Sequence, residues 1–112
     1  MPKHLTGPVD RQIDAYNRRD IEAFVSVYAD DAVIFNPPRV PVLQGREAIR
    51  ERYAELFRDS PELRATVHHR TVVGEWVVDH ETVEGASIPG VGEAIVAYRV
   101  NDEKILEVVV LK

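Results

Sequence analysis

The N-terminal part of the chain repeats apolar side chains at the spacing of an α-helix. Val9, Ile13 and Tyr16 recur at intervals that place them on one face of a helix. Thr6 is suited to cap this helix, and Pro8 would lie in its opening turn. The pattern therefore predicts a first helix that begins near Thr6 and buries one face.

Two further helices are predicted in the first half of the chain. The polar run NRRD at residues 17–20 ends the first helix, and its Asp20 can cap a second one. The apolar stripe of this second helix is Ile21, Phe24, Val25 and Tyr28. A third helix is expected after Gly45 over residues 46–59, and its apolar stripe is Ile49, Tyr53, Leu56 and Phe57.

One short strand is predicted between the second and third helices. Residues 32–35, AVIF, are continuously apolar and rich in strand-forming side chains. Asn36 and the two prolines after it are expected to end the strand, because proline cannot donate a hydrogen bond to a sheet. Pro41 is expected to keep the following segment irregular.

Four longer strands are predicted after Pro61, in segments rich in valine, threonine and aromatic residues. These segments are residues 62–73, 75–84, 93–101 and 104–111. Turns are expected at Gly74, in SIPGVG at 87–92 and in NDEK at 101–104. Helices followed by strands with short connections predict an α+β fold whose late strands form an antiparallel meander.

The last predicted strand is apolar on both of its alternations. The two sets of side chains are Leu106, Val108 and Val110 on one side, and Ile105, Val109 and Leu111 on the other. A sheet that is covered by helices on one side needs only one apolar face. The second face therefore predicts a homodimer through the outer side of the sheet. The alternative is that these valines reflect strand propensity alone.

Composition excludes several classes of function. The chain has 112 residues, no cysteine, a net charge of -5 and a pI near 5.3. This acidity argues against binding to nucleic acid or to an anionic membrane surface, and the lack of cysteine excludes thiol chemistry. We expect one domain over residues 1–112, located in the cytoplasm, with no signal peptide, no membrane span and no cofactor.

Two stretches resemble a known family. The run AYNRRDIEAFVSVYADDAVIFNPP, followed by QGREAIRERYAELF, is similar to the nuclear-transport-factor-2-like superfamily, in its SnoaL-like and ketosteroid-isomerase-like branch. The resemblance implies a cystatin-like α+β barrel, in which a conical curved antiparallel sheet wraps around three N-terminal helices. It also implies a largely apolar pocket and usually a dimer. Such motifs specify the fold far better than the function.

The isomerase chemistry of that branch can be compared with this sequence position by position. An isomerase of this kind needs a carboxylate base and two oxyanion donors, a tyrosine and a protonated aspartate. The matching positions here are Asn36, Gln12 and Val96, none of which fits its role. Steroid isomerisation by that mechanism is therefore not expected. Tyr28 and Tyr53 match tyrosines that support the pocket in some isomerases, and they also fit a role as core residues.

The sequence Asp79-His80-Glu81 looks like a cluster for acid–base chemistry. Successive side chains of a strand point to opposite faces, so His80 is separated from both carboxylates. Alignment with the family predicts that His80 and Thr82 face the pocket. Asp79 and Glu81 are then expected on the outer face, where they could pair with Arg99.

The strand at 62–73 contains a second candidate histidine. Its apolar residues favour the odd positions as the inner ones, which predicts that His69 faces inward and that His68 and Arg70 face outward. Two inward histidines could form an acid–base pair. They could also bind a metal with Glu84, although the spacing matches no ligand signature. They could equally be hydrogen-bonded residues of the pocket wall.

These observations lead to two main hypotheses of function, and a third possibility is a degenerate relative that keeps a pocket but performs no reaction. The first is a domain that binds a small apolar molecule and possesses acid–base activity of an isomerase, cyclase or hydrolase type, in which His80, with His69, transfers protons and Asn36 orients the ligand. The ligand-binding residues predicted for it are Asn36, Tyr28, Tyr53, Thr82, Val96 and Tyr98. The second is a non-catalytic dimeric module that uses the same fold for protein association.

Overall fold

The computed structural model describes residues 3–36, 40–86 and 92–111. Within these ranges the helices are α1 (Lys3–Arg18), α2 (Ile21–Ser26) and α3 (Arg46–Asp59). The strands are β1 (Tyr28–Asn36), β2 (Val40–Gln44), β3 (Arg64–Val73), β4 (Trp76–Glu84), β5 (Glu93–Asn101) and β6 (Lys104–Leu111). The α+β class predicted from the sequence is confirmed.

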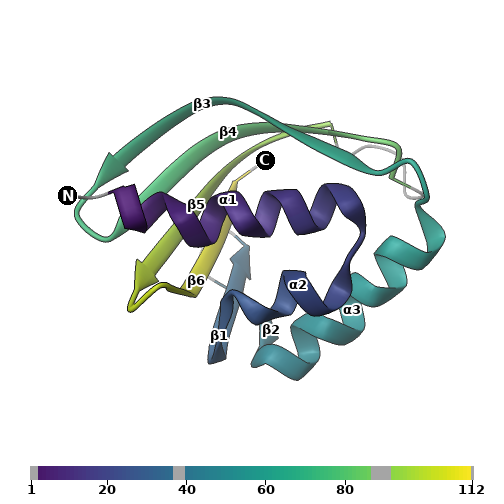
Figure 1. Ribbon diagram of the computed structural model, residues 1–112, viewed down its shortest axis with the longest axis horizontal. Coiled ribbons are helices and arrows are strands. Elements are labelled where there is room, and N and C mark those ends of the chain that lie inside the picture. The colour runs from purple at the N-terminus through teal and green to yellow at the C-terminus, as the bar shows by residue number, and fades with distance from the viewer. Residues whose placement is uncertain (1–2, 37–39, 87–91, 112) are drawn as a thin grey trace.

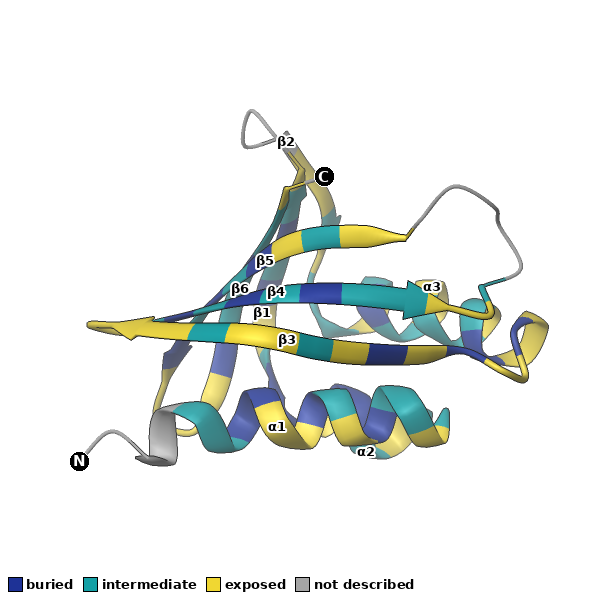
Figure 2. Ribbon diagram, turned by 90° about the horizontal axis from the view of Figure 1, so that it is seen from above, coloured by how far each residue is buried: buried dark blue, intermediate teal, exposed yellow. Residues whose placement is uncertain are grey.

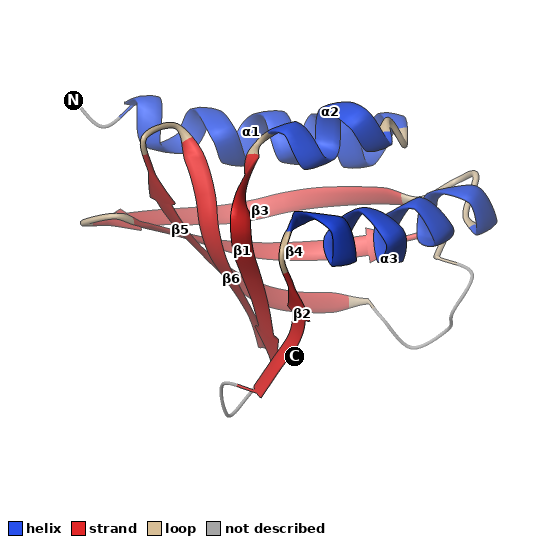
Figure 3. Cartoon of the chain, turned by 90° about the horizontal axis from the view of Figure 1, so that it is seen from below, coloured by secondary structure: helices blue, strands red, loops and turns tan. Residues whose placement is uncertain are grey.

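The strands form one curved sheet in the order β2-β1-β6-β5-β4-β3. The predicted meander is confirmed, because β3, β4, β5 and β6 pair consecutively and antiparallel. The sheet is nevertheless mixed, since β1 runs parallel to β6, and it is open, with β2 and β3 at its edges. Helix α1 lies against β3, β4, β5 and β6 on the concave side, as Figures 1 and 3 show.

Three local predictions differ from the structure. Helix α1 begins at Lys3, so Thr6 lies inside it. Strand β1 begins at Tyr28, which the apolar pattern assigns to the second helix. Pro41 lies in strand β2, opposite Phe35, although the sequence predicts an irregular segment there. An edge strand tolerates this proline because one side of its backbone needs no partner. The predictions for Pro37, Pro38 and residues 87–91 fall outside the described residues.

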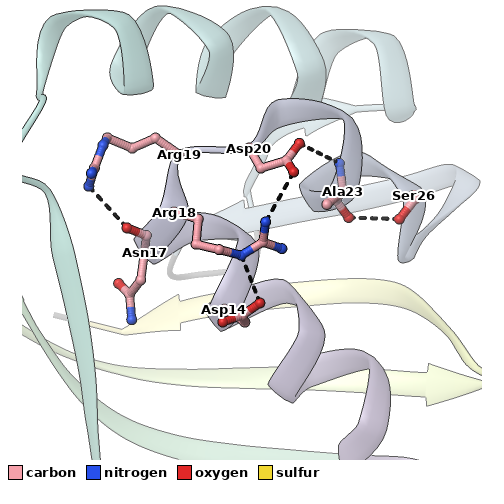
Figure 4. Close-up of polar contacts among 7 residues, drawn as sticks. All are labelled: Asp14, Asn17, Arg18, Arg19, Asp20, Ala23 and Ser26. Atoms are coloured by element: carbon pink, nitrogen blue, oxygen red, sulfur yellow. Dashed lines mark hydrogen bonds and ion pairs between the residues drawn. The ribbon is translucent and has the colours of Figure 1, made fainter.

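The polar turn between α1 and α2 forms as predicted (Figure 4). Asp20 is the N-cap of α2 and accepts a hydrogen bond of 3.1 Å from the backbone N–H of Ala23. Arg18 contacts the carboxylates of Asp14 at 2.9 Å and Asp20 at 3.2 Å. Arg19 has a positive φ of 57°, which reverses the chain between the helices. The local signals in NRRD therefore specify this turn well.

The same turn attaches the helices to strand β3. The side-chain amide of Asn17 donates to the carbonyl of Ala65 at 3.0 Å and accepts from its N–H at 2.6 Å. The guanidinium of Arg19 donates to the carbonyl of Leu63 at 2.9 Å. These bonds satisfy backbone groups at the start of β3, and they hold the helix pair against the sheet.

The hydrophobic core lies between the helices and the concave face of the sheet, where Figure 2 shows the buried segments. Phe24 is fully buried near its centre. Its ring centroid lies 4.7 Å from that of Tyr53, 5.3 Å from that of Tyr28 and 5.4 Å from that of Phe57. Burial of these aromatic rings stabilises the packing of the helices. Among the described residues, no helix combines the length and the apolar character that a membrane crossing requires.

Candidate functional site

The inner face of β4 carries the carboxylates and its outer face carries the histidine. Along this strand Val77, Asp79 and Glu81 are buried, whereas Val78 and His80 between them are half-buried, as the alternating colours in Figure 2 show. The prediction that His80 faces the pocket and that Asp79 and Glu81 face outward is therefore wrong.

The strand register explains this placement. Val77 is paired with Tyr98 and Asp79 with Val96 across β4 and β5, and both partners belong to the buried core. His80 is paired instead with Ile95, which is exposed. Valines occur on both alternations of β4, so hydrophobic pattern alone could not tell one face from the other.

A β-bulge in β3 reverses the predicted orientation of His69 and Arg70. The pairing between β3 and β4 shifts between Val67 and His69, and after the shift His69 is opposite His80. His69 is exposed and does not line the cavity, so the prediction of an inward His69 is wrong. Arg70, predicted to point outward, is opposite Asp79 instead. One extra residue in a strand changes the face of every residue after it.

Asp79 is fully buried because Arg70 neutralises it. The guanidinium of Arg70 binds its carboxylate at 2.7 Å and 2.9 Å, and the same guanidinium binds Asp10 of α1 at 2.6 Å. Hydrogen bonds to both aspartates, chiefly to Asp79, hold the pKa of Arg70 above its usual range. This geometry connects β3, β4 and α1 through one charged group. The predicted pairing of Asp79 and Glu81 with Arg99 is wrong, since Arg99 binds Glu107 on β6 at 2.8 Å.

Glu81 is a buried carboxyl group with an elevated proton affinity. The residue is 7% exposed and accepts a hydrogen bond of 2.6 Å from the hydroxyl of Tyr98. Burial, and after it the charge of Asp79, raises the pKa of Glu81 from 4.5 to about 7. The hydrogen bond from Tyr98 and the charge of Arg70 act in the opposite direction. Glu81 therefore changes its charge near neutral pH.

Glu81 and Tyr98 lie on the wall of a cavity of about 570 Å³ between the helices and the sheet. Most of the wall is apolar and includes Ile13, Ile34, Leu43, Leu56, Val83 and Val108. The polar groups of the wall are Glu81, Gln12, Asn36, Arg52 and the tyrosines at 16, 28, 53 and 98. A concave, mostly apolar site with a few polar groups is typical of small-molecule binding.

The tyrosines supply neutral hydrogen-bond donors to this cavity. Burial raises the pKa of Tyr28, Tyr53 and Tyr98 above the usual range of a phenol. Their hydroxyls therefore stay protonated at physiological pH. The side-chain amide of Gln12 donates to the Tyr28 hydroxyl at 3.3 Å, and both residues are buried. The backbone of Tyr28 is fixed by Arg46 of α3, whose guanidinium donates to its carbonyl at 2.7 Å.

The structure brings together five of the residues predicted to bind a ligand. Asn36, Tyr28, Tyr53, Val96 and Tyr98 all line the cavity, as the sequence predicts. Their participation in binding stays a prediction. The sixth residue, Thr82, does not line the cavity. Its hydroxyl is 2.8 Å from Nε2 of His68 on the outer face, so its predicted orientation is wrong.

Two histidines, His68 and His80, form a separate cluster on the outer face of the sheet. Nε2 of His80 is 2.5 Å from a carboxylate oxygen of Glu93, and the ring centroids of His68 and His80 are 5.3 Å apart. Across the described ranges, no group of three or more histidine, cysteine, aspartate or glutamate side chains could hold a metal ion.

The sequence does not predict that Glu81, Arg70 and Gln12 shape the site. Glu81 alternates with Val77 and Val83 on one face of β4. When carboxylates lie between valines on the same face of a strand, the pattern indicates that this face is buried and that the carboxylates are buried with it. The signal is ambiguous without the register, because Trp76 and Val78 make the other alternation equally apolar.

Comparison with known proteins identifies the family of this chain. A family model described as a SnoaL-like domain matches residues 9–108. An uncharacterized cystatin-fold protein from Novosphingobium aromaticivorans is 24% identical with a TM-score of 0.82, over 96% of this chain and 97% of that one. A candidate polyketide cyclase from Sinorhizobium meliloti is 21% identical with a TM-score of 0.79, over 93% of each chain. A computationally designed 17-OHP binder is 18% identical with a TM-score of 0.76, over 92% of this chain and 86% of that one.

Proposed function

Because this chain belongs to the SnoaL-like domain family, we propose that it binds a small, largely apolar molecule and transfers protons on it, with Glu81 as the acid–base group. The observation that carries this proposal is the position of Glu81. Its carboxyl group is buried on the wall of a cavity of about 570 Å³, and its pKa is about 7. Among the described residues that line the cavity, Glu81 is the only one with a carboxyl side chain.

A carboxyl group with a pKa near 7 can act as a base and as an acid at physiological pH. About half of the molecules would carry the ionised carboxylate, which can remove a proton from a bound ligand. The apolar wall lowers the local dielectric constant and strengthens any charge interaction with the reacting atoms. The hydroxyl of Tyr98 donates to Oε2 of Glu81, which stabilises the ionised form and fixes the direction of the carboxyl group.

The related structures support a small-molecule ligand for this fold. One is a candidate polyketide cyclase and another is a designed 17-OHP binder. The positions that carry ketosteroid isomerase chemistry hold Asn36, Gln12 and Val96 here. We therefore place the acid–base group on β4, at Glu81, and assign Asn36 the orientation of a ligand carbonyl or hydroxyl at the cavity wall.

A substrate with a readily removed carbon-bound proton tests this proposal without knowledge of the natural ligand. In 5-nitrobenzisoxazole a base takes the proton from C3, the N–O bond breaks, and a coloured cyanonitrophenolate is released. The wild-type protein should accelerate this reaction, with a rate that rises with pH around a midpoint of about 7. The Glu81→Gln variant should lose this acceleration.

The matched control is His80→Gln, on the neighbouring residue of the same strand. His80 lies outside the cavity, so this variant should react like the wild type. Equal rates for wild type and Glu81→Gln would contradict the proposal. Loss of the reaction in His80→Gln alone would restore the histidine hypothesis.

The second candidate is a dimeric association module, and it is favoured by the exposed apolar side chains of the sheet. Ile95 is 38% exposed and Leu111 is 43% exposed, and these two residues are paired across β5 and β6. A homodimer through this outer face would cover them. Light scattering after size exclusion should then give twice the chain mass, and Ile95→Lys should give the monomer mass. A monomeric wild type over the micromolar range would exclude this candidate.

A further inference from the structure

The side chain of Gln12 carries a polar atom that lacks a partner in the core. Gln12 is 7% exposed and lies on the wall of the cavity. Its Nε2 donates to the Tyr28 hydroxyl at 3.3 Å. Its Oε1 is buried and, among the described residues, has no hydrogen-bond partner. A buried acceptor without a donor is costly, so its presence beside a cavity needs an explanation.

The neighbouring Tyr28 offers the complementary group. Its hydroxyl oxygen accepts the hydrogen bond from Gln12, so its own hydrogen is available to donate. Tyr28 is 1% exposed and lines the same cavity. Contacts with the Phe24 ring and with Arg46 hold it in place. The Gln12–Tyr28 pair therefore presents one acceptor and one donor side by side.

We infer that the ligand carries a hydroxyl group on its apolar skeleton and that Gln12 and Tyr28 recognise this group. A hydroxyl both donates and accepts. It can accept from Tyr28, and it can donate to Oε1 of Gln12 once rotation of the terminal amide turns this buried atom toward the cavity. A ketone or an ether accepts only and would leave Oε1 of Gln12 unpaired. This inference rests on the proposed function only in that the cavity is the ligand site.

Glu81 does not replace Gln12 in this role. Its Oε2 already accepts from Tyr98, and its charge changes around a pKa of about 7. Oε1 of Gln12 is an acceptor at every pH. Selection of the ligand's hydroxyl by Gln12 is therefore separable from proton transfer by Glu81, and each can be removed by its own substitution.

Three naphthalene probes test the inference by calorimetric or fluorescence titration. The probe 2-naphthol carries a hydroxyl, 2-methoxynaphthalene keeps only the acceptor oxygen, and 2-methylnaphthalene matches the hydroxyl in size without any polar atom. The wild type should bind 2-naphthol roughly tenfold more tightly than either of the others, the size of one well-made hydrogen bond. In Gln12→Met the preference over 2-methoxynaphthalene should disappear, and in Glu81→Gln it should persist.

Gln12→Met keeps the length of the side chain and removes the unpaired atom together with the hydrogen bond to Tyr28, so its stability should be close to that of the wild type. Should it fail to fold, Tyr28→Phe gives a second route, because it removes the donor to the ligand oxygen and should reduce, without abolishing, the preference for 2-naphthol over 2-methylnaphthalene. A preference that survives in Gln12→Met, or equal binding of 2-naphthol and 2-methoxynaphthalene to the wild type, would overturn the inference.

The outcomes also separate this inference from the proposed function. Loss of the preference in Glu81→Gln but not in Gln12→Met would make Glu81 the acceptor, which overturns the inference and leaves the proton-transfer proposal intact. A Glu81-dependent reaction of 5-nitrobenzisoxazole, in a protein that shows no preference for 2-naphthol, would also overturn the inference and leave the proton-transfer proposal intact. Binding of none of the three probes would overturn the inference together with the ligand site that it requires.

Discussion

The two faces of strand β4 place two titratable side chains, Glu81 and His80, in opposite environments. On the inner face Glu81 is buried, accepts a hydrogen bond from Tyr98 and has a pKa of about 7. On the outer face His80 is half-buried and contacts Glu93, and its ring lies near that of His68. A histidine is the side chain that usually titrates near neutral pH. Here burial gives that property to a glutamate next to it in the sequence.

The environment of a residue on β4, more than its type, decides whether it can act as an acid–base group. Asp79 and Glu81 share the inner face but differ in their partners. Asp79 is neutralised by Arg70 in a geometry with two hydrogen bonds, whereas Glu81 has a neutral phenol as its partner. The first arrangement is structural, and the second leaves a carboxyl group whose proton can be exchanged.

The largest effect should follow removal of Arg70. Arg70→Met leaves the fully buried Asp79 without its counter-charge and should destabilise the fold by about 3–5 kcal/mol in urea unfolding. The control is Arg18→Met, which breaks an exposed pair with Asp14 and should have little effect. If the two variants were equally stable, Arg70 could not be the group that makes the burial of Asp79 tolerable.

The next effect concerns the pH dependence of stability. The pKa of Glu81 is raised in the folded protein, so the folded state binds more protons than the unfolded state between pH 4.5 and about 7. The contribution of Glu81 to stability is therefore lost as the pH rises through this window. Relative to the wild type, Glu81→Gln should gain up to about 3 kcal/mol of stability between pH 5 and pH 8.

This prediction is checked by urea unfolding at pH 5 and pH 8 for both proteins. The stability of the variant relative to the wild type should increase with pH, because the amide that replaces the carboxyl group cannot ionise. A difference that is the same at the two pH values would show that Glu81 has an ordinary pKa in the folded protein.

A smaller effect should follow removal of the phenol. The hydrogen bond from Tyr98 lowers the pKa of Glu81, so Tyr98→Phe should raise that pKa further. The pH profile of the reaction with 5-nitrobenzisoxazole should then move to higher pH. A profile that moves to lower pH, or does not move, would exclude Tyr98 as the group that stabilises the ionised carboxylate.

The smallest effect is expected on the outer face. His80→Gln removes the contact with Glu93 at a half-buried position and should change the unfolding free energy by no more than about 0.5 kcal/mol. Binding of 2-naphthol should also be unchanged. A loss of binding in this variant would show that the two faces of β4 are coupled in a way that their geometry does not reveal.

Most of the fold could be predicted from the sequence because its signals are local. The Asp20 cap, the polar turn at 17–20 and the strong strand segments after Pro61 each depend on neighbours in the chain. The sequence does not predict strand β2, because Pro41 is compatible with a strand only at the edge of a sheet. That position is a property of the whole sheet and cannot be read from the segment.

The site could be predicted only in part because its decisive features depend on register. The cavity is lined by Tyr28, Tyr53, Asn36, Val96 and Tyr98, and their binding of a ligand stays a prediction. The faces of β3 and β4 were assigned wrongly, because a bulge shifts one strand and valines occupy both alternations of the other. The partners that make buried carboxylates tolerable come from other elements of the fold, so the local sequence contains no direct signal of them.

The most direct test of Glu81 as the acid–base group is a carbon-13 NMR titration of its carboxyl group, assigned by the loss of its signal in Glu81→Gln. We predict a midpoint of about 7, with a chemical-shift change that reports ionisation of a buried carboxyl group. A midpoint near the usual 4.5 would contradict this prediction, and would remove Glu81 as the acid–base group of this protein.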